Sequence, residues 1–146
     1  MPVRTIKTAV LSAAVPLLVT QEAAGAGAWQ VRITGFESTE GALAIALFDN
    51  AADYESQSNA VRRAWLEVSG AEVVWEVESL PAGDYALIAY QDTNGNREID
   101  FRILGMPKEP VGVSNNARGV FGPPGFDAAK FSVGDDGTAH QHLHLR

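Results

Sequence analysis

The stretch EVVWEVE, residues 72–78, decides the fold class of this chain. Val73, Trp75 and Val77 stand at every second position of this stretch, and glutamates occupy residues 72, 76 and 78. Because successive side chains of a β-strand point to opposite faces, this alternation puts the apolar side chains on one face and the carboxylates on the other. The stretch is therefore predicted to be a strand with one face buried and the other in water.

Short apolar runs with the same period recur on both sides of it, separated by Gly, Pro, Asn and Asp. They predict strands at residues 29–36, 43–48, 85–90, 130–133 and 140–145. The first two are predicted to form a hairpin across the turn ESTEG. Residues 85–90 are apolar on both faces, which indicates a central strand. The pattern predicts an all-β fold, an antiparallel β-sandwich of about seven strands.

Two segments break the alternation. Residues 50–68 carry Ala, Glu and Arg without a period of two, so we expect a short helix or a loop across one end of the sheet. Residues 101–126 are rich in Gly, Pro and Asn. Structureless segments of that length in compact domains are usually functional or disordered, and aromatic residues argue against disorder. The second segment is predicted to be one long ordered loop packed on the sandwich.

The N-terminal segment, residues 1–28, has the pattern of a signal peptide. Arg4 and Lys7 precede an apolar run at 8–19, and small residues follow at 24–28. The run contains Pro16 and is shorter than the roughly 20 residues that a membrane-spanning helix needs. We expect export to the periplasm or the cell exterior, and a single domain at residues 29–146.

Charge and cysteine content narrow the function further. The chain of 146 residues has a formal charge of -7, and removal of the signal would leave 9 basic and 17 acidic side chains, a charge of -8. Such a surface repels nucleic acid and anionic membranes, so neither is expected as a partner. The chain has no cysteine, which excludes disulfides and thiol redox chemistry.

Two long stretches resemble a known family: LPAGDYALIAYQDTNGNREIDF at 80–101 and LGMPKEPVGVSNNARGVFGPPGFDAAKF at 104–131. With the alternating strands, the chain from about residue 30 to 145 is similar to the exported bacterial proteins grouped as domain of unknown function 2141. The resemblance implies a prealbumin-like or immunoglobulin-like sandwich with a signal peptide, and it implies no reaction. Where the family usually has a His and a Gly in its loop, this chain has Gln91 and Arg97.

The loop that begins at Asp92 is a candidate calcium site. Oxygen donors stand at its positions one, three, five and nine, which are Asp92, Asn94, Asn96 and Asp100. Calcium prefers six to eight oxygen ligands from a tightly coiled loop, and this spacing turns alternate side chains inward. Glu109, Asn115 or Asn116 would have to supply the missing oxygens.

Two alternatives to calcium stay open. Position six is Arg97 where calcium loops of the EF-hand type have Gly, and position twelve is Ile103 where they have Glu. Asp92 and Asn94 would then cap their own backbone in an ordinary Asx turn. Alternatively, the guanidinium of Arg97 would take the place of a cation beside Asp92 or Asp100.

The chain has three histidines, His140, His142 and His144, which share one face of a predicted strand while Leu143 and Leu145 face the core. Imidazole clusters suit Zn, Cu or Ni, and the alternative is a solvated strand face. A further candidate surface, for a glycan or a cell-envelope protein, comprises Ser114, Asn115, Asn116 and Arg118. In the alternative, these asparagines satisfy the backbone of the loop.

The sequence carries no nucleophile elbow, no H-E-x-x-H motif and no phosphate-binding glycine loop. We therefore expect a non-catalytic binding or structural module with no certain cofactor and calcium as the candidate ion. The alternatives are a small hydrolase or isomerase that uses a pocket beside the long loop, and a periplasmic transition-metal binder.

Overall fold

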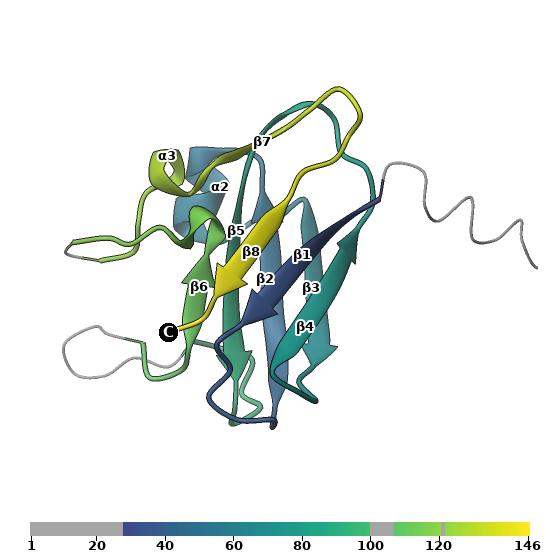
Figure 1. Ribbon diagram of the computed structural model, residues 1–146. Helices are drawn as coiled ribbons and strands as arrows, with labels where there is room; N and C mark the ends of the chain where they lie inside the picture. Colours follow the sequence, from purple (N-terminus) through teal and green to yellow (C-terminus); the bar gives the residue numbers. More distant parts are fainter. Residues whose placement is uncertain (1–27, 100–106, 121) are drawn as a thin grey trace, which may run out of the picture.

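The computed structural model describes residues 28–99, 107–120 and 122–146. Eight strands in this part of the chain form two sheets that face each other, so the predicted all-β sandwich is confirmed. Figure 1 shows the smaller sheet in front of the larger one. The predicted signal peptide, apart from residue 28, and Asp100 lie outside the described residues. The prealbumin-like or immunoglobulin-like detail stays a prediction.

The smaller sheet has the order β4 (Glu72–Val77), β1 (Trp29–Thr34), β8 (Gln141–His144). The stretch that predicted the fold is β4, and Trp75 and Val77 are buried as expected. β1 pairs antiparallel with β4 but parallel with β8. The prediction of a wholly antiparallel sandwich is therefore wrong at this pair, because the chain crosses from the larger sheet before it enters β8.

The larger sheet has the order β3 (Arg62–Glu67), β2 (Ala42–Phe48), β5 (Gly83–Asp92), β6 (Val111–Val113). A fifth strand, β7 (Phe131–Val133), also pairs with β5. The prediction of a central strand at 85–90 is confirmed, since β5 has neighbours on both sides. Its inward residues, Tyr85, Leu87 and Ala89, are all buried.

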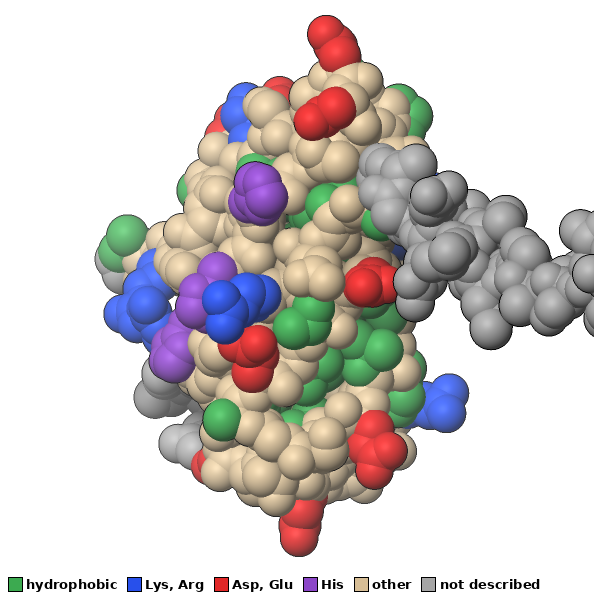
Figure 2. All heavy atoms as spheres, turned by 45° about the vertical axis from the view of Figure 1, so that its right-hand side comes forward, with side chains coloured by type: hydrophobic (Ala, Val, Ile, Leu, Met, Phe, Trp, Pro, Cys, Tyr) green, Lys and Arg blue, Asp and Glu red, His purple; other side chains and the backbone are tan. Residues whose placement is uncertain are grey.

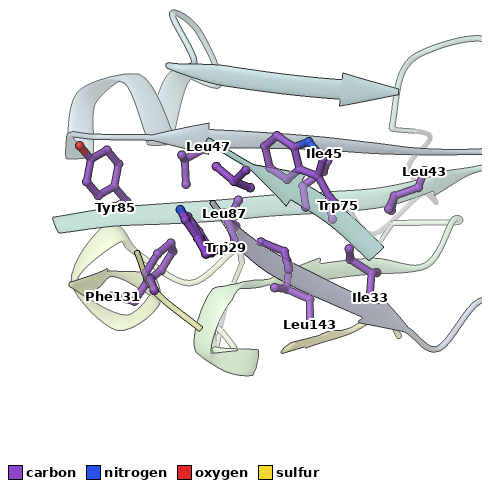
Figure 3. Close-up of a cluster of buried hydrophobic side chains, with 14 of the residues drawn as sticks. Trp29, Ile33, Leu43, Ile45, Leu47, Trp75, Tyr85, Leu87, Phe131 and Leu143 are labelled. Carbon is purple, nitrogen blue, oxygen red and sulfur yellow. The ribbon is translucent and has the colours of Figure 1, made fainter. Parts of the chain in front are cut away.

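The main core fills the space between the two sheets (Figure 3). Trp29, Ile33 and Leu143 reach into it from the smaller sheet, and Leu43, Leu87 and others from the larger sheet. Trp29 and Phe131 meet edge to face, with their ring centroids 5.8 Å apart. This core replaces the disulfides that the chain lacks.

The predicted hairpin of residues 29–36 and 43–48 is wrong. Alternation identified both strands, but β1 and β2 belong to different sheets. The chain turns between them at Gly35 and Gly41, whose φ angles of 83° and 78° favour glycine. A Cβ atom on Gly41 would also overlap the carbonyl oxygen of Asp92, so this turn abuts the candidate calcium loop.

The segment 50–68 contains the predicted helix and also a strand that the sequence did not indicate. Helix α2 (Ala51–Ser56) begins at Asn50, whose side chain accepts a hydrogen bond of 2.9 Å from the amide of Asp53. β3 follows it. Its Ala64 and Leu66 pack against the core, whereas Trp65 points outward and is 42% exposed, so apolar residues on both faces obscured the alternation.

The segment 101–126 is not a loop without secondary structure, since it includes β6 and the 3-10 helix η1 (Ser114–Asn116), and α3 (Phe126–Ala129) begins at its last residue. Residues 101–106 and 121 lie outside the described residues. Helices α2 and α3 lie beside each other (Figure 1) and cover part of the outer face of the larger sheet. None of the described helices is long and apolar enough to span a membrane.

Tyr54 of α2 makes the stability of this outer layer decrease at alkaline pH. Its ring lies edge to face with Phe48 and Phe126, and its hydroxyl donates to the carbonyl oxygen of Pro124 at 2.9 Å. Burial, with a smaller contribution from the charge of Glu55, raises the pKa of Tyr54 to about 12. The unfolded chain therefore releases this proton at lower pH than the folded chain.

The stabilisation is fully present below pH 10 and is lost as the pH rises from about 10 to about 12. We expect this loss to amount to about 2 kcal/mol in the free energy of unfolding, measured in urea at a series of pH values. Tyr54→Phe should remove this part of the pH dependence. An unchanged slope in the variant would show that Tyr54 does not titrate in this way.

Candidate functional site

The candidate calcium loop starts at the last residue of β5, Asp92, whose side chain is fully buried. One carboxylate oxygen, Oδ1, accepts a hydrogen bond from the amide of Gly95 at 2.8 Å. The other, Oδ2, accepts one from the amide of Arg97 at 2.7 Å. The buried carboxylate therefore coils the loop around itself, because charge-assisted bonds of this kind are stronger than neutral ones.

The next two oxygen-bearing side chains repeat this pattern on the loop surface. Oδ1 of Asn94 accepts from the amide of Asn96 at 3.1 Å, and Oδ1 of Asn96 accepts from the amide of Glu98 at 3.0 Å. These are the Asx turns that the alternative without calcium predicted. Within the described ranges, no group of three or more His, Asp or Glu side chains is arranged to hold a metal ion. Calcium binding stays a prediction.

Arg97 has the backbone conformation that the glycine at position six of a calcium loop would have. Its φ is 63°, a left-handed conformation that costs a residue with a Cβ atom about 1–2 kcal/mol. Its guanidinium does not turn into the loop. The carbon Cζ lies 5.2 Å from the centre of the Trp65 ring, which is a cation–π contact. The positive charge of Arg97 therefore lies on the outer face of the larger sheet.

Two buried polar side chains near Asp92 bond the backbone of neighbouring segments. Gln91 is fully buried, and its amide nitrogen donates to the carbonyl oxygens of Ser38 and Glu40 at 3.0 and 2.9 Å. Its Oε1 accepts from the amide of Glu37 at 2.9 Å. Glu109, 5% exposed, accepts from the amide of Thr93 at 3.3 Å. Gln91, which stands where the family usually has His, therefore holds the β1–β2 connection by hydrogen bonds.

An open groove of about 420 Å³ lies on the outer face of the larger sheet, between this loop and α2. The strand register produces its shape. On β2, Ala44 and Ala46 form a floor of small side chains. Opposite Ala44 stand Trp65 on β3 and Tyr90 on β5, and opposite Ala46 stand Arg63 and Ile88.

The groove residues were missed at the level of sequence. Its described lining comprises Ala44, Ile45, Ala46, Phe48, Gln57, Arg63, Ala64, Trp65, Ile88, Tyr90 and Arg97. The available signal was the pattern ALAIALF, in which every second residue of a strand is Ala on the face that does not meet the core. Small side chains flanked by aromatic residues on both neighbouring strands leave a hollow.

Tyr90 supplies a phenol to this lining. Burial raises its pKa, and the nearby charges of Asp92, Glu109 and Glu98 raise it further, while Arg63 lowers it. The phenol therefore stays protonated near neutral pH and is a hydrogen-bond donor in the groove.

The structure brings two of the three histidines together. Nε2 of His142 and Nδ1 of His144 lie 2.9 and 3.0 Å from the hydroxyl oxygen of Thr34. His140 and His142 line a shallow hollow with Arg32. In Figure 2, histidine side chains on this side of the molecule lie beside Lys and Arg side chains. A cationic neighbour disfavours a bound metal ion, and the transition-metal site stays a prediction.

The segment Ser114–Asn116 makes structural hydrogen bonds. Ser114 is fully buried, and its hydroxyl donates to the carbonyl of Ala129 and accepts from the amide of Leu87. The side chain of Asn116 pairs with the backbone of His142 and His144, as a neighbouring strand would. Asn115 bonds Ala128, Lys130 and Gln141, and Arg118 is exposed. These bonds are those of the structural alternative, and a ligand surface here stays a prediction.

The fold and this corner define a class of protein: a β-sandwich with a coiled, carboxylate-centred loop at the end of its central strand. The chain belongs to the family described as an uncharacterized protein conserved in bacteria (DUF2141), which matches residues 31–141. The predicted family is thereby confirmed. No curated protein and no solved structure matches the chain.

Proposed function

We propose that the protein is an exported, non-catalytic binding module whose ligand occupies the groove on the outer face of the larger sheet. The observation that supports this best is the position of Arg97. A buried carboxylate, a strained backbone and a 5.2 Å contact with Trp65 together hold its guanidinium at the groove. Strain of this kind persists where the surroundings impose it, and it concentrates at functional positions.

The lining of the groove favours binding over catalysis. Its described residues include no carboxylate, imidazole or thiol. General acid–base catalysis near neutral pH needs a group that exchanges protons there, and Tyr90 with its raised pKa is a poor base. The lining suits recognition, since it combines apolar and aromatic surface with a few polar groups. Export is proposed on the charge and apolar pattern of residues 1–28.

Trp65 supplies the experiment that tests this function. Of the three tryptophans, Trp29 and Trp75 are buried whereas Trp65 is 42% exposed, so a ligand in the groove would change mainly the emission of Trp65. We expect at least one member of a panel of soluble sugars, organic acids and short peptides to change this emission. Ala44→Phe, which fills the floor, should abolish the change. A panel without any response would refute the proposed function.

A second proposal is that calcium stabilises the Asp92–Asp100 loop. It is favoured by the left-handed φ of 63° at Arg97 and by the hydrogen bond that the amide of Arg97 donates to the carboxylate of Asp92. This geometry would coil the loop around an ion. Glu109 is a second buried carboxylate next to the loop, bonded to the amide of Thr93.

Calcium should therefore raise the midpoint of thermal unfolding. At a free concentration 100 times the dissociation constant, the gain would be about 2.7 kcal/mol in the free energy of unfolding. Chelation should reverse the gain, magnesium should give less of it, and Asp92→Asn should reduce it. A midpoint that is the same in calcium and in chelator would rule out the calcium proposal and leave the groove proposal untouched.

A further inference from the structure

The groove has a direction and two different ends. It follows β2, with Arg63 and Gln57 near the end that α2 closes and Arg97 near the end that the loop closes. Nη2 of Arg63 donates to the carbonyl oxygen of Gln57 at 3.3 Å, which holds this guanidinium at its end. A ligand that lies along the alanine floor would therefore meet a guanidinium at each end.

The two arginines stand out against the charge of the molecule. The chain has a net charge of -7, yet the described lining of the groove carries two positive side chains and no carboxylate. Two other cations, Arg32 and Lys130, are paired with Glu72 and Asp127. Arg63 and Arg97 form no ion pair with any described carboxylate. At physiological ionic strength, charges beyond about 8 Å are screened, so these local cations decide which ligand is favoured.

The position of the groove argues against an extended peptide. Peptides that bind sheets usually add a strand at an edge, where free backbone groups supply most of the affinity. The floor here is β2, which is paired with β3 on one side and with β5 on the other. Its backbone groups are already used. Recognition must come from side chains and bridging water, as in the binding of a hydroxylated ring.

The walls fit a sugar ring. Trp65 and Tyr90 flank Ala44 on the two neighbouring strands and line the groove, where they offer aromatic surface to the C–H groups of a pyranose. The phenol of Tyr90 and the side chain of Gln57 offer hydrogen bonds to ring hydroxyls. Because guanidinium groups match the geometry of carboxylates, an acidic sugar fits better than a neutral one.

We propose that the groove binds a chain of uronic-acid sugars, with the ring faces on the alanine floor between Trp65 and Tyr90 and the carboxylates on Arg63 and Arg97. This inference rests on the proposed function and names its ligand class. It requires no covalent step.

The test is a titration of the full domain with oligogalacturonate, followed by isothermal calorimetry and by the emission of Trp65. The same oligomer with its carboxylates methyl-esterified is the matched neutral ligand. We expect the acidic oligomer to bind at least about tenfold more tightly than the ester, since a charge-assisted hydrogen bond contributes about 1.5–3 kcal/mol.

Variants distinguish the effect of a lost charge on binding from the effect of a loss of folding. Arg63→Gln should weaken binding about tenfold, and Trp65→Ala by a similar factor. Arg62→Gln is the matched control, since this neighbour on β3 is exposed, bonds the carbonyl of Val61 and does not line the groove. It removes the same charge and should change the affinity less than about twofold. Urea unfolding of each variant identifies any loss of folding.

The outcomes distinguish the two proposals. Equal affinities for acid and ester, or equal effects of Arg62→Gln and Arg63→Gln, would overturn the acidic ligand class while the groove remained a binding site. Absence of oligogalacturonate binding would also overturn it. If another ligand then changed the emission of Trp65 and the Ala44→Phe variant lost that change, the proposed function would stand with a different ligand.

Discussion

Asp92→Ala should lower the free energy of unfolding by about 3 kcal/mol, the largest effect that we expect from any side chain of the loop. The variant removes the fully buried acceptor of the amides of Gly95 and Arg97. Each amide then loses a charge-assisted bond, and the methyl group of alanine offers no acceptor in its place. The measurement is urea unfolding followed by circular dichroism.

Two comparisons make this result specific. Asn94→Ala removes an exposed acceptor in the same loop and should cost about 0.5–1 kcal/mol. In the Asp92→Ala variant, acrylamide should also quench the emission of Trp65 more strongly, because Arg97 loses the bond that holds its guanidinium over that ring. A loss below about 1 kcal/mol, or no change in quenching, would contradict the role of Asp92 as the centre of the loop.

The sequence predicted the strands of this fold better than their partners. Alternation depends only on one buried face, so β1, β2, β4 and β5 were identified from their own residues. Pairing depends on the connections. Gly35 and Gly41 carry the chain from one sheet to the other, and no local pattern separates such a crossing from a hairpin turn. β3 escaped notice because Trp65 is apolar on an exposed face.

The candidate site was predictable in part for a similar reason. The spacing of Asp92, Asn94 and Asn96 predicted that their side-chain oxygens act together. Each side chain accepts a hydrogen bond from a backbone amide two to five residues further along the chain. The role of Arg97 depends on a residue of another strand, Trp65, which only the tertiary structure brings near. The groove is likewise a property of three paired strands, so no single segment indicates it.

Gln91→Leu should destabilise the fold by about 3 kcal/mol, although leucine has a similar volume and suits a buried position. The amide side chain satisfies three backbone groups of the β1–β2 connection: the amide of Glu37 and the carbonyls of Ser38 and Glu40. Leucine leaves all three part-buried groups without this partner. The free energy of unfolding in urea gives the magnitude.

Gln91→His tests the same bonds with the residue usual in the family. A neutral imidazole has one donor and one acceptor, whereas the glutamine amide has two donors and one acceptor, so histidine can satisfy two of the three backbone groups. We expect this variant to lose about 1–1.5 kcal/mol of the free energy of unfolding, so that its stability lies between that of the wild type and that of Gln91→Leu. If histidine were as destabilising as leucine, the shape of the side chain and not its hydrogen bonds would hold the connection. That outcome would also remove the explanation for a buried glutamine next to Asp92, because an amide in an apolar core is stabilising only when its donors and acceptors are satisfied.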